Sequence, residues 1–151
     1  TGSEDRGRAF DINITLTALE KDVAIGGRPK AGYGGMTYRA APAENQDIAP
    51  IVADKSSTPR PAWCRYTADF SDGRQRTSLV LFQHPENPQY PSPHNVYANI
   101  NCFMPAYPGD TEYPLPKGQP VTLKHRVWIV EGVPPHEQLE KAWKAYASAG
   151  Q

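Results

Sequence analysis

A proline-rich loop carries most of the polar side chains in this sequence that could do chemistry. It follows the short apolar run LVLF at 79–82 and is punctuated by Pro85, Pro88, Pro91 and Pro93. Because proline fixes φ and removes an N–H donor, this segment cannot form a helix or an inner strand of a sheet. It offers several side chains that could bind a ligand: His84, Asn87, Tyr90, His94 and Asn95. Rigid loops on a β scaffold often hold binding residues, so we expect these groups to project outward.

Two histidines of this segment, His84 and His94, are the candidates for catalysis. A histidine can serve as general acid or base when a carboxylate lies beside it. The sequence offers several carboxylates, and spacing selects none of them: Asp69, Glu86, Glu112 and Glu131. The chain contains no GxSxG motif, which argues against a serine hydrolase. It also contains no HxH, HxxxH or CxxC pair, so we predict no metal site and no cofactor.

Aromatic, amide and guanidinium side chains are interspersed along the chain, and this mixture suits a sugar ligand. A sugar ring offers C–H faces to aromatic rings and neighbouring hydroxyls to planar polar groups. We predict these substrate-binding residues: Arg39, Trp63, Tyr66, Asn87 and Asn95. The alternative for each aromatic residue is that it fills the hydrophobic core.

The bulk properties exclude several classes of partner. The 151 residues include 16 basic and 16 acidic side chains, so the formal net charge is zero and no basic face for nucleic acid is evident. No apolar run reaches membrane-spanning length. The compartment stays open, with the periplasm or secretion favoured over the cytoplasm. Two cysteines, Cys64 and Cys102, lie in apolar contexts, which favours buried free thiols over a disulfide.

Alternating and apolar stretches between frequent turns predict an all-β antiparallel sandwich. Residues 1–9 read as a loose segment, 10–133 as the sandwich and 134–151 as a helix packed on it. The clearest strands are Phe10–Leu19, Ala62–Phe70, Thr77–Gln83 and Val121–Val130. The polar segment 42–61 reads as a long loop. The helix after Pro134-Pro135 has an apolar stripe at helical spacing: Leu139, Ala142, Trp143, Tyr146 and Ala147.

Several motifs together resemble a bacterial family labelled PmoA-like, or "methane oxygenase PmoA". The most specific is HPENPQYPSPH at 84–94, and LPKG at 115–118 follows it along the chain. The other segments are FDINITLTAL at 10–19, GYGGMTYR at 32–39, AWCRYTADFSDG at 62–73 and VWIVEG at 127–132. The chain resembles the C-terminal half of that family. Methane oxidation is rejected, because the chain has neither a membrane-spanning segment nor a cluster of copper ligands.

The resemblance implies a β-sandwich of the galactose-mutarotase or supersandwich type and a link to sugar metabolism. Sites of that type use a histidine acid and a carboxylate base on a sheet face, which would suit His84 with Arg39 and Asn87 on the substrate. It also implies a partner, either an upstream β-rich half or another protomer. We therefore expect the strands at 10–19 and 121–130 to present an apolar face or an unpaired edge.

Two functions remain as hypotheses. In the first, the domain binds or acts on a carbohydrate near His84. In the second, it is a non-catalytic binding or scaffold module whose HPxNP loop is purely structural, with His84 and Asn87 bonding backbone groups that the prolines leave without partners. Burial separates the two: a loop histidine that is buried and bonded only to backbone favours the scaffold, and one that opens into a cleft with a carboxylate nearby favours chemistry.

Overall fold

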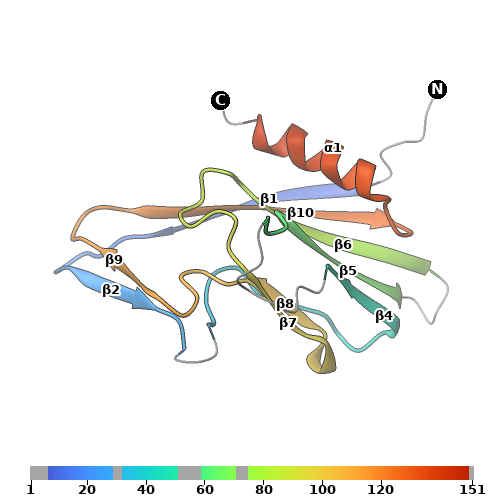
Figure 1. Ribbon diagram of the computed structural model, residues 1–151, viewed down its shortest axis with the longest axis horizontal. Helices are drawn as coiled ribbons and strands as arrows, with labels where there is room; N and C mark the ends of the chain where they lie inside the picture. The colour runs from blue at the N-terminus through green and yellow to red at the C-terminus, as the bar shows by residue number, and fades with distance from the viewer. Residues whose placement is uncertain (1–6, 29–31, 51–58, 71–74, 150–151) are drawn as a thin grey trace.

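The computed structural model describes residues 7–28, 32–50, 59–70 and 75–149. Within these ranges the chain forms strands and one α-helix, in the following order: β1 (Gly7–Leu16), β2 (Val23–Gly26), β3 (Tyr38–Arg39), β4 (Glu44–Ala49), β5 (Trp63–Phe70), β6 (Gln75–Gln83), β7 (His94–Tyr97), β8 (Cys102–Pro105), β9 (Glu112–Leu115), β10 (Val121–Glu131) and α1 (His136–Ala147). A short 3₁₀ turn, Ala98–Ile100, joins β7 to β8. The prediction of an all-β domain with one C-terminal helix is confirmed (Figure 1).

The strands form three antiparallel sheets. The main sheet has five strands in the order β1-β10-β6-β5-β4. A three-stranded sheet, β3-β8-β7, lies beneath part of it, and β2 pairs with β9 at one end of the molecule (Figure 1). β6 and β10 occupy inner positions of the main sheet, so both edges of each strand are paired.

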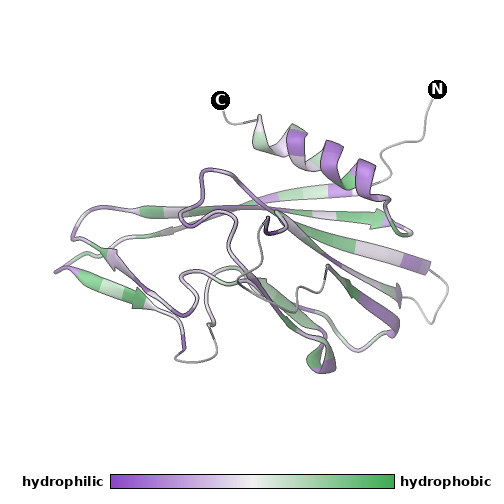
Figure 2. Ribbon diagram, viewed as in Figure 1, coloured by the Kyte–Doolittle hydropathy of each residue, from purple (hydrophilic) through white to green (hydrophobic). Residues whose placement is uncertain are grey.

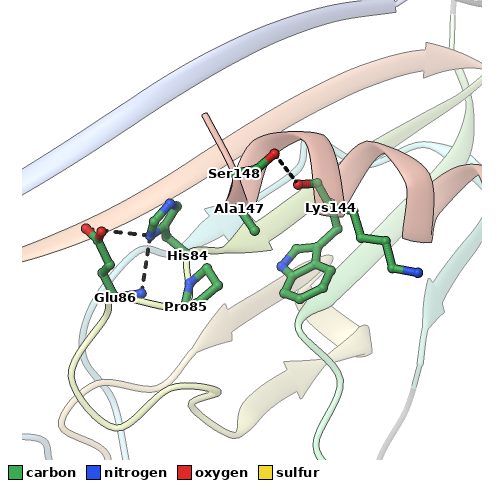
Figure 3. Close-up of a pocket in the computed structure, with 7 residues that line it drawn as sticks. His84, Pro85, Glu86, Lys144, Ala147 and Ser148 are labelled. Carbon is green, nitrogen blue, oxygen red and sulfur yellow. Dashed lines mark hydrogen bonds and ion pairs between the residues drawn. The ribbon is translucent and has the colours of Figure 1, made fainter. Parts of the chain in front are cut away.

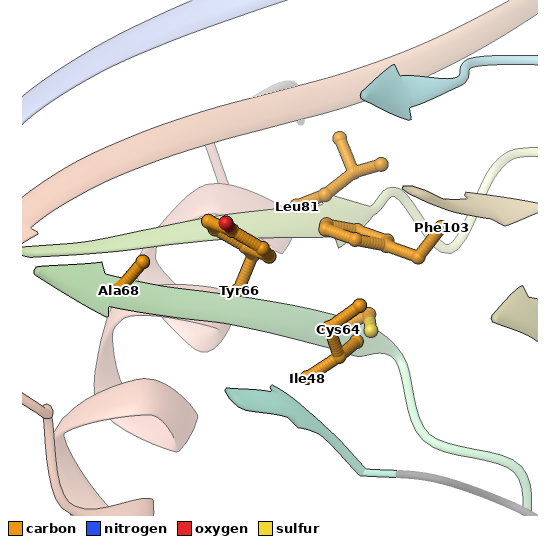
Figure 4. Packing of buried hydrophobic residues seen from close by; sticks show 6 residues of the cluster. All are labelled: Ile48, Cys64, Tyr66, Ala68, Leu81 and Phe103. Atoms are coloured by element: carbon orange, nitrogen blue, oxygen red, sulfur yellow. The ribbon is translucent and has the colours of Figure 1, made fainter. Parts of the chain in front are cut away.

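The core of the sandwich lies between the main sheet and the three-stranded sheet. Tyr66 and Leu81 of the main sheet pack against Phe103 of β8, and all three are fully buried (Figure 4). Cys64 belongs to the same cluster, and both cysteines are buried free thiols, as predicted. A Tyr or Phe side chain contributes about 3–5 kcal/mol to such a core, measured as the cost of truncation to alanine.

The opposite face of the main sheet is covered by α1. Because side chains alternate along a strand, Leu81 faces the sandwich while Val80 and Phe82 face the helix. Leu139 and Tyr146 of α1 are buried on them, and hydrophilic and hydrophobic residues alternate along the helix (Figure 2). A strand buried on both faces reads as a continuous apolar run, which explains LVLF at 79–82.

Several predicted boundaries need correction. The first strand begins at Gly7 rather than Phe10, so residues 7–9 are not loose, and residues 1–6 lie outside the described ranges. The helix begins at His136, directly after the two prolines. The predicted turn at 71–74 also lies outside the described residues.

Part of the segment 42–61 was wrongly predicted to be a loop. Its residues 44–49 form β4, an edge strand whose exposed residues are polar and whose Ile48 packs into the sandwich core. A single core residue in a polar stretch leaves too weak an alternation to recognise as a strand. Residues 51–58 are outside the described ranges.

The expectation of an apolar face or an unpaired edge is confirmed for the first strand but not for the last, because β10 is an inner strand with Leu123, Trp128 and Val130 buried. β1 ends the strand order of the main sheet, and Phe10 is 52% exposed. Ile129 of β10 and Leu16 of β1 are 38% and 36% exposed.

Candidate functional site

The loop after β6 and the last turns of α1 enclose a cleft of about 270 Å³, which we call the His84 cleft (Figure 3). The loop contributes His84, Pro85 and Glu86, and the helix contributes Trp143, Lys144, Ala147 and Ser148. β6 carries the chain to His84, and Pro85 stops the strand there. The apolar stripe of α1 anchors the helix over β6 and thereby places Trp143 and Lys144 opposite the loop.

His84 lies at the floor of this cleft and is held by neighbours on two sides. Its Nδ1 accepts a hydrogen bond from the Glu86 backbone N–H at 3.2 Å and lies 3.9 Å from Glu86 Oε2. Its ring meets the Tyr146 ring edge to face, with centroids 5.1 Å apart. Since Nδ1 accepts, the neutral imidazole carries its proton on Nε2.

Glu86 is a charged group on the rim of the cleft. Its carboxylate forms an ion pair with Lys124 of β10, and the hydrogen bond and charge of Lys124 hold the pKa of Glu86 below its usual value. Its side chain is half exposed to solvent. On the opposite wall, Lys144 pairs with Glu140 one helical turn earlier, with 2.8 Å between Nζ and Oε1. The rim therefore holds one carboxylate and one ammonium group that water can reach.

Aromatic rings form the remaining wall and continue beyond it. Trp143 Nε1 donates a hydrogen bond to the Gln83 carbonyl at 3.1 Å, which fixes the indole against the end of β6. The ring of Tyr90 lies parallel to it, with an interplanar angle of 5° and centroids 6.5 Å apart. Trp63 also lies beside Trp143, with centroids 6.2 Å apart and the rings tilted by 42°. All three rings are only partly buried.

The same loop also contains polar side chains that are turned inward. Asn87 bonds the backbone of Lys124 twice, donating to its carbonyl at 2.8 Å and accepting from its N–H at 2.6 Å. Gln83 bonds the backbone of Ser92 in the same way, donating to its carbonyl at 3.0 Å and accepting from its N–H at 2.8 Å. Asn95 donates to the carbonyl of Gly32 at 2.8 Å. These amides replace backbone partners that a proline-rich segment cannot supply.

Two buried histidines lie beside these amides. His94 begins β7, with its Nε2 3.4 Å from Gln83 Nε2, and His125 lies opposite Gln83 in the pairing of β10 with β6. The pKa of each ring is lowered to about 4; burial is the main cause for both, and the charge of His125 contributes for His94. Both rings are therefore neutral at pH 7, and both are less than 7% exposed.

The prediction that the loop side chains project outward is wrong for most of them. His84, Asn87, His94 and Asn95 are each less than 7% exposed, and His94 belongs to a strand rather than to the loop. The physical reason is that prolines leave N–H and C=O groups unpaired, and the nearby amides turn inward to bond them.

The predicted site residues do not all meet at one place. His84 lines the cleft, and Trp63 lies behind its aromatic wall. His94, Asn87 and Asn95 belong to the buried polar network, and Tyr66 belongs to the sandwich core. Arg39 is exposed on β3, in the three-stranded sheet.

Residues of α1 complete the cleft, and the sequence analysis did not assign them to it. Trp143 was assigned to the apolar stripe of the helix, and Lys144 and Ser148 were not singled out. Helical spacing shows that Trp143 faces the sheet, but it does not show which loop the end of the helix reaches.

Fold and cleft together define an all-β, sandwich-like domain with an open site between a loop and a covering helix. The chain belongs to a family of unknown function, DUF6807, whose model matches residues 1–144. No curated protein and no solved structure matches the sequence. The described part of the chain holds no helix of the length and hydropathy needed to span a membrane. Within the same ranges, no three His, Cys, Asp or Glu side chains gather as a metal site would require.

Proposed function

We propose that this chain is a carbohydrate-binding domain and that the His84 cleft is its site. The observation that carries the proposal is the convergence of His84, Glu86 and Trp143 around one cavity of about 270 Å³. An indole offers a face to a sugar ring, and imidazole and carboxylate groups bond its hydroxyls. The volume is at the lower end of ligand pockets and suits roughly one sugar residue.

The resemblance to the PmoA-like family, in its C-terminal half, supports the same proposal. That resemblance implies a mutarotase-like sandwich in which a histidine acts as an acid, and this role falls on His84. Its Nδ1 accepts the Glu86 N–H, which leaves Nε2 as the ring nitrogen that could exchange a proton with a substrate. If the domain also makes or breaks a bond, His84 is the residue we assign to the proton transfer.

Titration calorimetry with a panel of neutral hexoses, a uronic acid and an amino sugar tests this function. We expect at least one of them to bind, and Glu86→Gln to weaken its binding about tenfold, because a hydrogen bond to a charged group contributes roughly 1.5–3 kcal/mol. Glu44→Gln, at an exposed position on β4, is the matched control and should leave binding unchanged. Absence of binding for the whole panel, or equal loss in both variants, would contradict the proposal.

A second candidate is a non-catalytic scaffold module, and the buried amides favour it. Asn87 bonds the backbone of Lys124 and Gln83 bonds the backbone of Ser92, as a structural loop requires. Under this function the loop braces β6 against β10, and the cleft is a surface hollow without a ligand. The calorimetric panel separates the two functions, since only the first predicts saturable heat.

A further inference from the structure

The two edges of the main sheet differ in how they are protected from other strands. β4, at one edge, is six residues long, and its pairing with β5 shifts register between Glu44 and Asp47. Gln46 of β4 also donates to the carbonyl of Ala98, at 2.9 Å. Short length, a bulge and charged residues are the devices that keep an edge strand from pairing with another chain.

β1, at the other edge, is neither short nor bulged, although it carries two charged residues, Arg8 and Asp11. It is ten residues long, contains neither lysine nor proline, and pairs with β10 residue by residue without a shift. Its acidic residue, Asp11, is already neutralised by a bidentate pair with Arg126, with distances of 2.6 and 2.8 Å. Among the described strands, β1 has a neighbour on one side only. A long, regular and nearly neutral edge is a template for another strand.

We propose that the β1 edge is an interface between two copies of this chain, joined by antiparallel pairing of β1 with β1. With the two-fold axis at Ile12, Ile12 lies opposite its own counterpart and Phe10 lies opposite Ile14 of the second copy. These residues share one face of the strand by its two-residue period. Phe10, which is 52% exposed in a single copy, then gains an apolar neighbour.

Charge and shape select this register. An axis at Asp11 would place two carboxylates directly opposite each other, which is destabilising across antiparallel strands. With the axis at Ile12, Asp11 faces Asn13 and Arg8 faces Leu16. Arg8 and Ile129 line a hollow of about 390 Å³ at the end of the sheet, and the exposed Leu16 of the second copy lies beside it.

The interface is self-complementary for that reason. Each copy supplies one exposed leucine and one hollow, and a two-fold axis satisfies both at once. The result is a continuous ten-stranded sheet in which neither β1 is an edge. The His84 cleft is on the face that carries α1, whereas Phe10 lies on the opposite face, so the interface stands apart from the proposed sugar site.

Light scattering coupled to size exclusion, over a series of protein concentrations, tests the interface. We expect the unmodified chain to run at twice its own mass and Phe10→Lys to run at the mass of one chain. Val133→Lys, at a residue that is 49% exposed and outside the strands, is the matched control and should stay dimeric. Circular dichroism of Phe10→Lys checks that the fold is kept.

Cross-linking with diamide tests the register. Ile12→Cys should form a covalent dimer, because the introduced thiols lie opposite each other at the axis, while the native cysteines are buried. Val23→Cys, 42% exposed on β2, should not cross-link above background. A single-chain mass at every concentration, a dimer that Phe10→Lys leaves intact, or equal cross-linking of the two cysteine variants would overturn the proposal.

Discussion

The segment from the end of β6 to the start of β7 holds polar side chains that differ in where they point. Gln83, Asn87 and His94 are turned inward, whereas Glu86 meets water at the rim of the His84 cleft. Asn87 and Gln83 bond backbone groups and His94 contacts the Gln83 side chain, whereas Glu86 faces α1 across an open space. Polar residues a few positions apart therefore serve structure in one case and are available to a ligand in the other.

Burial decides the difference rather than residue type. A buried polar group without a partner costs about 1–3 kcal/mol. Replacing an inward amide should therefore lower the free energy of unfolding. A half-exposed ion pair such as Glu86 with Lys124 contributes roughly 0–1 kcal/mol to stability. Replacing Glu86 should therefore weaken sugar binding more than it lowers stability.

Acidification should destabilise the domain through the inward histidines. The pKa of His94 and of His125 is about 4 in the folded chain, against an ordinary value of 6.5. As pH falls from 6.5 to 4 the unfolded chain takes up protons that the folded chain refuses, so stability falls, by up to about 3 kcal/mol for each histidine. Above pH 6.5 neither histidine makes stability depend on pH. Urea unfolding at a series of pH values measures this slope.

The variant His94→Gln tests the assignment of that slope, because glutamine stays neutral throughout. Its stability should fall about half as steeply between pH 6.5 and 4.5 as that of the unmodified chain. The salt-bridged carboxylates Asp11, Asp69 and Glu86 have lowered pKa values and lose their pairs only at more acid pH, which keeps the two effects apart. An unchanged slope would show that His94 does not cause the loss of stability at acid pH.

Asn87→Ala should destabilise the domain by roughly 1–3 kcal/mol, because it leaves the Lys124 N–H without its partner, while the Lys124 carbonyl keeps the His84 N–H at 3.2 Å. Chemical denaturation measures the change. Asn99→Ala, at an exposed position of the 3₁₀ turn, should change stability by less than about 0.5 kcal/mol. A loss at Asn87 no larger than that at Asn99 would mean that the inward amides do not brace the loop.

Trp143→Phe should affect both stability and binding, because Trp143 bonds the backbone of Gln83 and also lines the His84 cleft. The phenyl ring keeps an aromatic wall but loses the hydrogen bond to the Gln83 carbonyl, so stability should fall by about 1 kcal/mol. Sugar affinity should fall as well, because the wall becomes smaller. A change in stability without any change in affinity would place the sugar elsewhere.

Lys144→Ala should have the smallest effect on stability, below about 0.5 kcal/mol, because its pair with Glu140 is exposed on the helix surface. Sugar affinity, measured by calorimetry, should drop measurably. Lys141→Ala, on an exposed position of the same helix, is the control for a general charge effect.

Much of the fold was predictable from the sequence, because the spacing of apolar residues shows which face of a strand or helix is buried and turn residues show where it ends. β1, β5, β6, β10 and α1 follow from alternation, apolar runs and helical spacing. β4 was missed, since its one core residue, Ile48, gives no pattern. The cleft was half predictable: HPxNP identifies His84, but the contact of that loop with Trp143 depends on how α1 crosses the sheet, which no local pattern records.

The most direct test of the central claim is a ¹H–¹⁵N NMR titration of the unmodified chain with the sugar panel. The account predicts that shifts concentrate on the backbone of His84, Glu86, Trp143 and Ser148 and on the Trp143 indole N–H, while β1 and the three-stranded sheet stay unchanged. Shifts centred on Arg39, or no saturable shift with any sugar, would contradict it.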